Sequence, residues 1–306
     1  MMIEVKNLVF EYPGTRALDD VSFSVEAGEI AALVGPNGAG KTTLLKCLAA
    51  LEQPIAGDIS VDGVDVLKDP RDCHERVGYL ADFFGLYQDL TLRQCLVYAA
   101  KSHNIPSHLE DKAVAKAAQR LHIDDRLQDK VHTLSRGLSQ RLAIAQSIIH
   151  EPLVLMLDEP ASGLDPQARS QLSSLFIELS QQGITLIVSS HILAELEEYC
   201  TSMLVVDEGK VIEHRHVSSP EINHIDLQLE LSAPVENLSV ILDTLDTVTV
   251  SQITDVSASI KLHGDRVDQT ALLKQLLNKN VPICAMYEKK ISLQESYLSQ
   301  LEEKEF

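Results

Sequence analysis

A glycine-rich stretch near the N-terminus could hold phosphate groups. The sequence GPNGAGKT, residues 35–42, follows an apolar segment, residues 30–34, and precedes a helical pattern that begins at Thr43. Glycines let the backbone wrap closely around phosphate oxygens, with the N–H groups pointing inward. In such a P-loop (Walker A) the ammonium of Lys41 reaches the β- and γ-phosphates, and Thr42 ligates Mg²⁺. The residues expected to contact a nucleoside triphosphate are Gly35, Asn37, Gly38, Ala39, Gly40, Lys41, Thr42 and Thr43.

Two adjacent carboxylates end a second apolar segment. LVLMLDEP, residues 153–160, has the pattern of a buried strand followed by Asp158 and Glu159. Side chains at the carboxyl end of a parallel strand face the crevice in which ligands bind. We therefore predict that Asp158 holds Mg²⁺ through water, because Mg²⁺ keeps several of its waters. Glu159 is the candidate general base that polarises the attacking water, and a helix cap or a solvated charge is its alternative role.

A histidine ends a third apolar segment. His191 follows TLIVSS, residues 185–190, at the predicted carboxyl end of a strand and level with Asp158 on a neighbouring strand. A lone histidine is more often structural than catalytic. In this position its imidazole could hydrogen-bond the γ-phosphate and hold the water in line, which predicts a positioning role in catalysis.

A serine and a glycine open a helical pattern in LSRGLSQ, residues 134–140. Such residues often do no more than cap a helix. A helix N-terminus with a free hydroxyl and open N–H groups is also an anion site. Ser135 and Gly137 are therefore candidates for a second phosphate contact, and these residues alone leave open whether that phosphate is bound by the same chain or by another.

The first 212 residues or so alternate strand-like and helix-like segments, which is an α/β layout. The apolar segments 153–157 and 184–190 lack alternation, as strands of a parallel sheet buried on both faces do. Segments 3–10 and 21–25 are too close together for a helical crossover and are predicted to be antiparallel strands. The region from about 91 to 150 is predicted to be mainly helical. Further predicted helices span 43–51, 166–181 and 192–199.

The last part of the chain follows a different pattern. Its order of strand, helix, strand, strand, helix and strand predicts a ferredoxin-like unit, followed by one more helix. His214 and His216 lie beside the expected linker, residues 216–224, and are predicted to be solvated. The predicted strands are 226–231, 248–253, 256–262 and 281–286, and the predicted helices are 235–245, 268–278 and 293–303.

Composition narrows the class of protein. The 306 residues are 45% apolar and carry a formal net charge of −19, which argues against binding a nucleic-acid backbone. The five cysteines are scattered without a C-x-x-C pair, which is typical of reduced thiols in a cytosolic protein. We expect no signal peptide and no transmembrane span, because no basic stretch precedes an apolar run and no such run approaches ~20 residues. Any membrane part would therefore belong to another chain.

The motifs together resemble the ATP-binding cassette (ABC) family. GPNGAGKT, LSRGLSQ, LVLMLDEP, SGLDP (residues 162–166) and SSH follow one another in that family's order and spacing, over residues 1 to about 212. The resemblance implies an α/β P-loop NTPase fold with an antiparallel β subdomain and a helical subdomain, to which a small C-terminal α+β domain is added. It also implies that ATP and Mg²⁺ are bound, with two ATP molecules held between head-to-tail protomers. Ser135 and Gly137 would then contact the γ-phosphate on the partner's P-loop, and Asp165 would cross the interface.

The resemblance also assigns two weaker positions and shows three departures. Tyr12 matches the aromatic residue that stacks on adenine, although it could be an ordinary strand-end residue. In YLADFFGLYQDLT, residues 79–91, Asp82 takes the place of a Gln that touches Mg²⁺ and senses the transporter. Asp82 is shorter and charged, which makes a water bridge to the metal plausible. In LSRGLSQ, Arg136 replaces a Gly and Leu138 replaces a Gln.

These features imply an ATPase subunit that powers a separate transmembrane permease. SRGLSQR and the terminal ISLQESYLSQL, residues 291–301, resemble the ABC-2-type exporter subfamily. We expect a bacterial homodimer at the cytoplasmic face of the inner (cell) membrane, attached through the permease and without a nucleic-acid partner. The expected parts are an ABC ATP-binding domain (1–215, helical subdomain about 83–150), a linker (216–224) and an accessory domain (225–306).

Two alternative functions remain at this stage. One is a soluble ABC ATPase acting on the ribosome or nucleic acid. Such relatives usually carry two cassettes or a long coiled coil, whereas this chain has one cassette, no heptad run and no basic tail. The other is a nucleotide-binding regulator without turnover, against which the presence of both Glu159 and His191 argues.

Overall fold

A computed structural model shows two compact units, Met1–Val217 and Ser218–Phe306. We call them the N-terminal and C-terminal units. The predicted linker, apart from His216, lies outside the described residues, as do the predicted final helix and half of the predicted helix 192–199. The structure describes residues 1–192, 196, 198–216, 225–235, 238–243, 245, 247–263 and 266–288.

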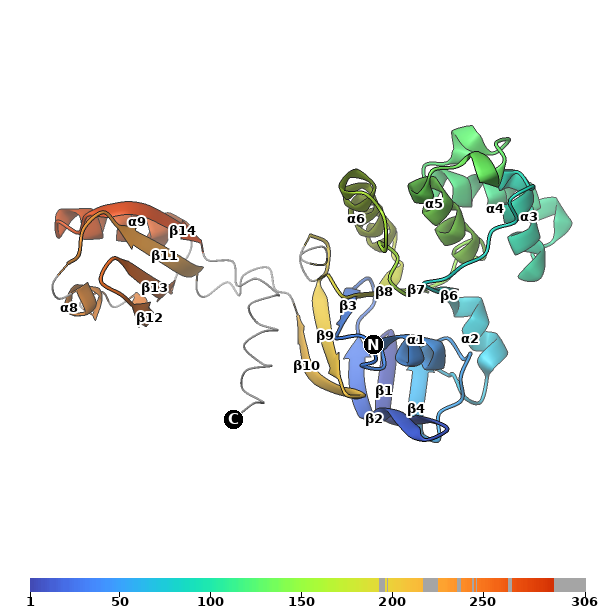
Figure 1. Ribbon diagram of the computed structural model, residues 1–306, viewed down its shortest axis with the longest axis horizontal. Coiled ribbons are helices and arrows are strands. Elements are labelled where there is room, and N and C mark those ends of the chain that lie inside the picture. The colour runs from blue at the N-terminus through green and yellow to red at the C-terminus, as the bar shows by residue number, and fades with distance from the viewer. Residues whose placement is uncertain are drawn as a thin grey trace. The chain divides into compact units, whose positions relative to one another are not determined.

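A six-stranded sheet runs through the N-terminal unit in the order β10-β9-β3-β8-β7-β6 (Figure 1). The pairs β3–β8, β3–β9, β6–β7 and β7–β8 are parallel, as predicted for the apolar segments without alternation. Strands β3, β7 and β8 are buried along their whole length, which explains why no polar residue alternates within them. The strands are β3 (Ile30–Val34), β6 (Val77–Leu80), β7 (Val154–Leu157), β8 (Thr185–Ser190), β9 (Ser202–Asp207) and, antiparallel to β9, β10 (Lys210–His216).

A second, antiparallel sheet has the order β2-β1-β4-β5. The predicted antiparallel pairing of the first two strands is confirmed, although β2 begins at Thr15 rather than at Val21. Apolar residues of β1, β2 and β4 share one buried cluster with α1 and with β3, so helix α1 lies in the core that joins both sheets. The elements are β1 (Ile3–Tyr12), β2 (Thr15–Val25), α1 (Lys41–Leu48), β4 (Ala56–Val61) and β5 (Val64–Asp65).

Three helices gather beside the β6 end of the large sheet (Figure 1). Helices α3, α4 and α5 contact one another, which confirms the predicted helical region between the two sheet segments. Helix α6 forms over the residues predicted for it, with Asp165 as its N-cap. The helices are α2 (Pro70–Arg76), α3 (Leu92–Ser102), α4 (Ser107–Arg120), α5 (Arg136–Ser147) and α6 (Pro166–Gln181), with short 3₁₀ turns η1 (Asp124–Arg126) and η2 (Val131–Thr133).

The C-terminal unit is a four-stranded sheet with the order β12-β13-β11-β14. All three neighbouring pairs are antiparallel, which is the arrangement expected of the predicted ferredoxin-like unit. Alternate residues of β11, such as Leu227 and Leu229, are fully buried with apolar residues of both helices. The elements are β11 (Ile225–Leu231), α8 (Leu238–Asp243), β12 (Val248–Ile253), β13 (Ser257–Leu262), α9 (Arg266–Asn278) and β14 (Ile283–Glu288).

Glycine at position 78 allows α5 to lie close to β6. A Cβ at Gly78 would collide with the carbonyl oxygen of Ser147, at the end of α5. We expect Gly78→Ala to lower the free energy of unfolding by about 1–3 kcal/mol, because a backbone oxygen cannot move aside as a side chain can. Urea denaturation measures this change. Gly85→Ala is the control, since nothing lies within 4 Å of that Cβ position, and equal stability of the two variants would contradict the expectation.

Candidate functional site

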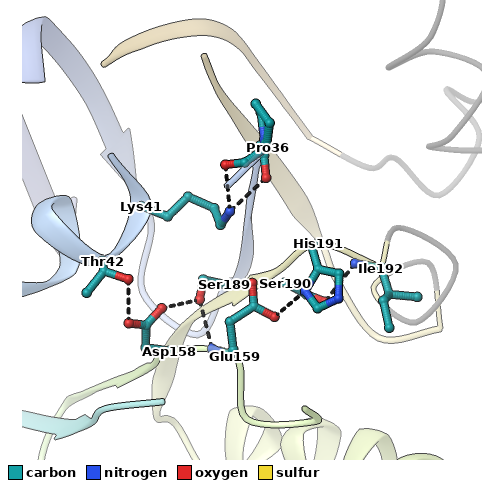
Figure 2. Close-up of polar contacts among 10 residues, drawn as sticks. Pro36, Lys41, Thr42, Asp158, Glu159, Ser189, Ser190, His191 and Ile192 are labelled. Carbon is teal, nitrogen blue, oxygen red and sulfur yellow. Dashed lines mark hydrogen bonds and ion pairs between the residues drawn. The ribbon is translucent and has the colours of Figure 1, made fainter. Parts of the chain in front are cut away.

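The glycine-rich loop joins β3 to α1 in the conformation that a phosphate-binding loop needs. Gly40 precedes the helix with a φ of 107°, and a Cβ there would lie 2.6 Å from the carbonyl oxygen of Ala17. Both the backbone conformation and the lack of space for a side chain therefore require glycine. The Nζ of Lys41 donates hydrogen bonds to the carbonyl oxygens of Gly35, at 2.7 Å, and Pro36, at 3.1 Å (Figure 2). The lysine therefore lies across the loop at the N-terminus of α1, where anions are favoured.

The charge of Lys41 is only partly compensated within the chain. Burial lowers the pKa of Lys41 below its ordinary value, while the nearby carboxylates of Glu159 and Asp158 act to raise it. A buried ammonium without full compensation favours the approach of an anion such as phosphate.

Asp158 is the buried centre of a hydrogen-bond network at the edge of the large sheet (Figure 2). It is 2% exposed, and its Oδ2 accepts a 2.7 Å hydrogen bond from the hydroxyl of Thr42. Its Oδ1 accepts a 2.6 Å bond from the hydroxyl of Ser189, which itself accepts a 2.9 Å bond from the N–H of Glu159. One serine thus fixes the side chain of Asp158 and the backbone of Glu159.

Ser189 was not among the residues predicted from the sequence. It lies in β8, whose residues are all buried. A buried hydroxyl needs a hydrogen-bond partner. The serines that end the apolar segment TLIVSS are therefore the signal that could have identified it.

Glu159 and His191 lie next to each other at the ends of β7 and β8, as Figure 2 shows. The Nδ1 of His191 and the Oε2 of Glu159 are 2.8 Å apart. Glu159 has a φ of 47°, in the left-handed region that residues other than glycine adopt infrequently. A carboxylate held by an imidazole can accept a proton from water, which is the role predicted for Glu159. The contact of His191 with Glu159 was not predicted from the sequence, which assigned the imidazole to the γ-phosphate.

A cleft of about 510 Å³ brings most of the predicted ligand-binding residues together. It unites Tyr12, at the end of β1, with the P-loop and with both carboxylates that follow β7. Thr15, Arg16, Ala17, Glu208 and Gly209 also line it and were not predicted. The lining comprises Tyr12, Thr15, Arg16, Ala17, Asn37, Gly38, Ala39, Gly40, Lys41, Thr42, Thr43, Asp82, Asp158, Glu159, Glu208 and Gly209.

Asp82 brings a third carboxylate to this cleft. Burial raises its pKa, and the charges of Asp158 and Glu159 raise it further, whereas Arg136 and His191 lower it. Clustered carboxylates favour a cation. The hydroxyl of Thr42 and the carboxylates of Asp158 and Asp82 are hard oxygen ligands, so the residues present fit Mg²⁺ held jointly with phosphate oxygens. Among the described residues, no cluster of His, Cys, Asp and Glu could hold a metal ion without such help.

Ser135, Gly137 and Asp165 lie together, but they do not line the cleft. Ser135 is the N-cap of α5, and its hydroxyl accepts a bond from the N–H of Leu138 at 3.3 Å. Asp165 is the N-cap of α6 and accepts a 2.9 Å bond from the N–H of Ala168. The three residues line a separate hollow of about 260 Å³. The structure thus divides most of the predicted site residues between two surfaces of the N-terminal unit, while Gly35 and His191 line neither hollow.

Comparison with known proteins points to one family. Residues 18–162 match the family model described as ABC transporter. The ABC transporter ATP-binding protein NatA of Bacillus subtilis (strain 168) is 34% identical over 198 residues, which are 64% of this chain and 80% of NatA. The Nod factor export ATP-binding protein I of Burkholderia orbicola (strain AU 1054) is 36% identical over 210 residues, 69% of each protein. A solved ATP-binding subunit of an ABC transporter superposes with a TM-score of 0.63, at 31% identity, over 71% of this chain and 90% of that one.

We predict that Ser189→Ala lowers ATP turnover roughly 10-fold or more, as loss of a group that orients a ligand commonly does. The substitution leaves Oδ1 of Asp158 without this bond and releases the N–H of Glu159. Steady-state phosphate release measures the effect. Ser190→Ala is the matched control, because the hydroxyl of Ser190 bonds only the N–H of Ile192 among the described contacts. If both variants turn over alike, the Ser189 bridge has no part in catalysis.

We predict that Asp82→Asn raises the Mg²⁺ concentration needed for half-maximal ATPase activity several-fold, because one of three clustered negative charges is removed. Titrating activity with Mg²⁺ at fixed ATP measures this. Asp89→Asn, an exposed change in the same segment, is the control. Identical Mg²⁺ dependence in both variants would show that Asp82 does not act on the metal.

Proposed function

The chain belongs to the family of ABC transporter ATP-binding proteins, and we propose that its ATPase activity powers a separate transmembrane permease of the ABC-2 exporter type. The observation that carries this proposal is the Glu159–His191 pair, placed beside the Asp158–Thr42 pair and the P-loop. The exporter assignment is supported by the similarity to a Nod factor export protein. Within the described residues, no helix is both long and apolar enough to cross a membrane.

The proposed reaction uses groups that the N-terminal unit already brings together. Lys41 and the loop N–H groups bind the β- and γ-phosphates, and Tyr12 stacks on adenine. Thr42 and Asp158, with Asp82 nearby, would hold Mg²⁺, which would supply positive charge to the phosphate oxygens. Glu159 accepts the proton of the water that attacks the γ-phosphorus, while the bond from phosphorus to the β–γ bridging oxygen breaks.

His191 has a positioning role in this proposal. Its imidazole lies 2.8 Å from Glu159 and can hold that carboxylate toward the water and the γ-phosphate. Ser189 fixes the Glu159 backbone from the other side. The general base is thus held at both its carboxylate and its N–H.

We propose a homodimer with ATP at its interface, and the division of the site between two surfaces supports it. Ser135, Gly137 and Asp165 line a hollow that shares no residue with the cleft of the same protomer. The N–H groups and hydroxyl at the start of α5 are suited to a phosphate. We propose that they contact the γ-phosphate of ATP on the partner's P-loop, which gives two equivalent sites per dimer.

The proposed permease contact lies just after Asp82. The side chains of Phe83, Tyr87 and Tyr98 are 92%, 59% and 57% exposed, and the two tyrosine rings meet edge to face at 5.7 Å. Exposed clustered aromatics mark interaction surfaces. A permease docked here would act on the cleft through Asp82, from the cytoplasmic face of the cell membrane.

The domain boundaries proposed with this function are 1–215 for the ATP-binding domain, 216–224 for the linker and 225–306 for the accessory domain.

A soluble ABC ATPase acting on the ribosome or nucleic acid is the second candidate function. The net charge of −19 disfavours binding of a nucleic-acid backbone. Purification of the tagged chain from its own host in mild detergent separates the two functions. A stoichiometric polytopic membrane protein is expected, and ribosomal proteins without a membrane protein would overturn the proposal.

The ATP sandwich itself is testable with Glu159→Gln. This variant should form a stable dimer in millimolar ATP, because the water loses its base while the phosphate contacts remain. Sedimentation velocity measures the dimer. Lys41→Ala in the same background should abolish it by removing the phosphate contact, and an ATP-bound Glu159→Gln chain that stays monomeric would contradict the model.

The proposed permease contact makes a separate prediction. Phe83→Ser with Tyr87→Ser should reduce the amount of copurified permease, because it removes two exposed aromatic contacts. ATPase activity of the isolated subunit should change little. Exposed Tyr287 in the C-terminal unit provides the control substitution Tyr287→Ser. Undiminished copurification of the double variant would place the permease contact elsewhere.

A further inference from the structure

Arg136 lies between the two segments that form the second surface. It is the first residue of α5, with Ser135 before it and Gly137 after it. Its guanidinium rests on the backbone of Gly163, so closely that a Cβ at Gly163 would overlap it. Gly163 has a φ of 67° and lies two residues before Asp165. The guanidinium of Arg136 therefore fills the space beside Gly163 and connects the LSRGLSQ segment to the SGLDP turn.

The two segments also meet at a second point. A Cβ at Gly137 would lie 3.3 Å from the Cβ of Ala168, so the first turns of α5 and α6 are in close approach. Ser135, Gly137 and Asp165 then line one hollow. The position of Asp165 relative to Ser135 thus depends on contacts between these segments. Arg136 makes one of them at Gly163, and a 2.9 Å hydrogen bond from Arg141 to Gln171 joins the same two helices further along.

We propose that Arg136 is a positioning residue that holds the SGLDP turn against the LSRGLSQ segment, so that Ser135, Gly137 and Asp165 meet the second protomer as one preformed surface. This inference rests on the proposed ATP sandwich. Association is stronger when the surface is already ordered, because less conformational freedom is lost on binding. A glycine at position 136 would leave this contact unmade.

A role within the same protomer's cleft is the competing explanation. The charge of Arg136 also reaches Asp82, which lines the nucleotide cleft. If this were the main role, replacing Arg136 would change the binding of Mg²⁺ and ATP by an isolated protomer. If the surface role is correct, protomer binding stays the same and only dimer formation weakens.

The experiment combines Arg136→Ala with Glu159→Gln, so that ATP hydrolysis does not dissociate the dimer during the measurement. Sedimentation at a series of protein concentrations in saturating Mg²⁺ and ATP gives the dimer dissociation constant. A fluorescent ATP analogue, titrated at protein concentrations where the chain is monomeric, gives the protomer affinity. We expect the dimer constant to rise about tenfold or more and the protomer affinity to change less than about twofold. Arg126→Ala, a partly exposed arginine of the same helical region, is the matched control.

Each other outcome has a distinct meaning. If Glu159→Gln alone does not dimerise, the ATP sandwich fails and the inference falls with it. If Glu159→Gln dimerises and Arg136→Ala behaves like Arg126→Ala, the sandwich stands and the inference is wrong. A loss of protomer affinity equal to the loss of dimerisation would assign Arg136 to its own cleft and would likewise overturn the inference.

Discussion

The two hydrogen bonds that Asp158 accepts are the interaction on which the rest of the site depends. One comes from Thr42 on α1 and the other from Ser189 on β8, so three elements far apart in sequence are joined at one carboxylate. A carboxylate that is 2% exposed would be costly without such partners. The same bonds set the distance between the P-loop and the end of β7, and therefore the position of Glu159 relative to any bound phosphate.

The parallel sheet makes this convergence possible. Strands β3, β6, β7 and β8 run in the same direction, so the loop that follows each of them opens at one edge. That edge receives the P-loop from β3, Asp82 from β6, the carboxylate pair from β7 and His191 from β8. The antiparallel sheet adds Tyr12, at the end of β1, to the lining of the cleft. Each element thus contributes one kind of chemistry.

The second surface lies apart from the nucleotide cleft, at the N-termini of α5 and α6. Ser135 and Asp165 are both helix N-caps, and each side chain already satisfies an N–H of its own helix. Their remaining capacity for hydrogen bonding lies open at the hollow between α5 and α6. The close approach at Gly78 packs the end of α5 against β6, the strand that leads to Asp82.

The sequence by itself determined the P-loop, the buried strands, the carboxylate pair and the βαββαβ order, because each depends on local residue type and periodicity. The strand pairings and the cleft agree with those expectations. Only the tertiary structure decided that Ser189 joins Asp158 to Glu159, that Arg16 and Glu208 line the cleft, and that β2 begins at Thr15. It alone placed the guanidinium of Arg136 on Gly163. These contacts join residues distant in sequence, and a single sequence carries no periodicity that records such distances.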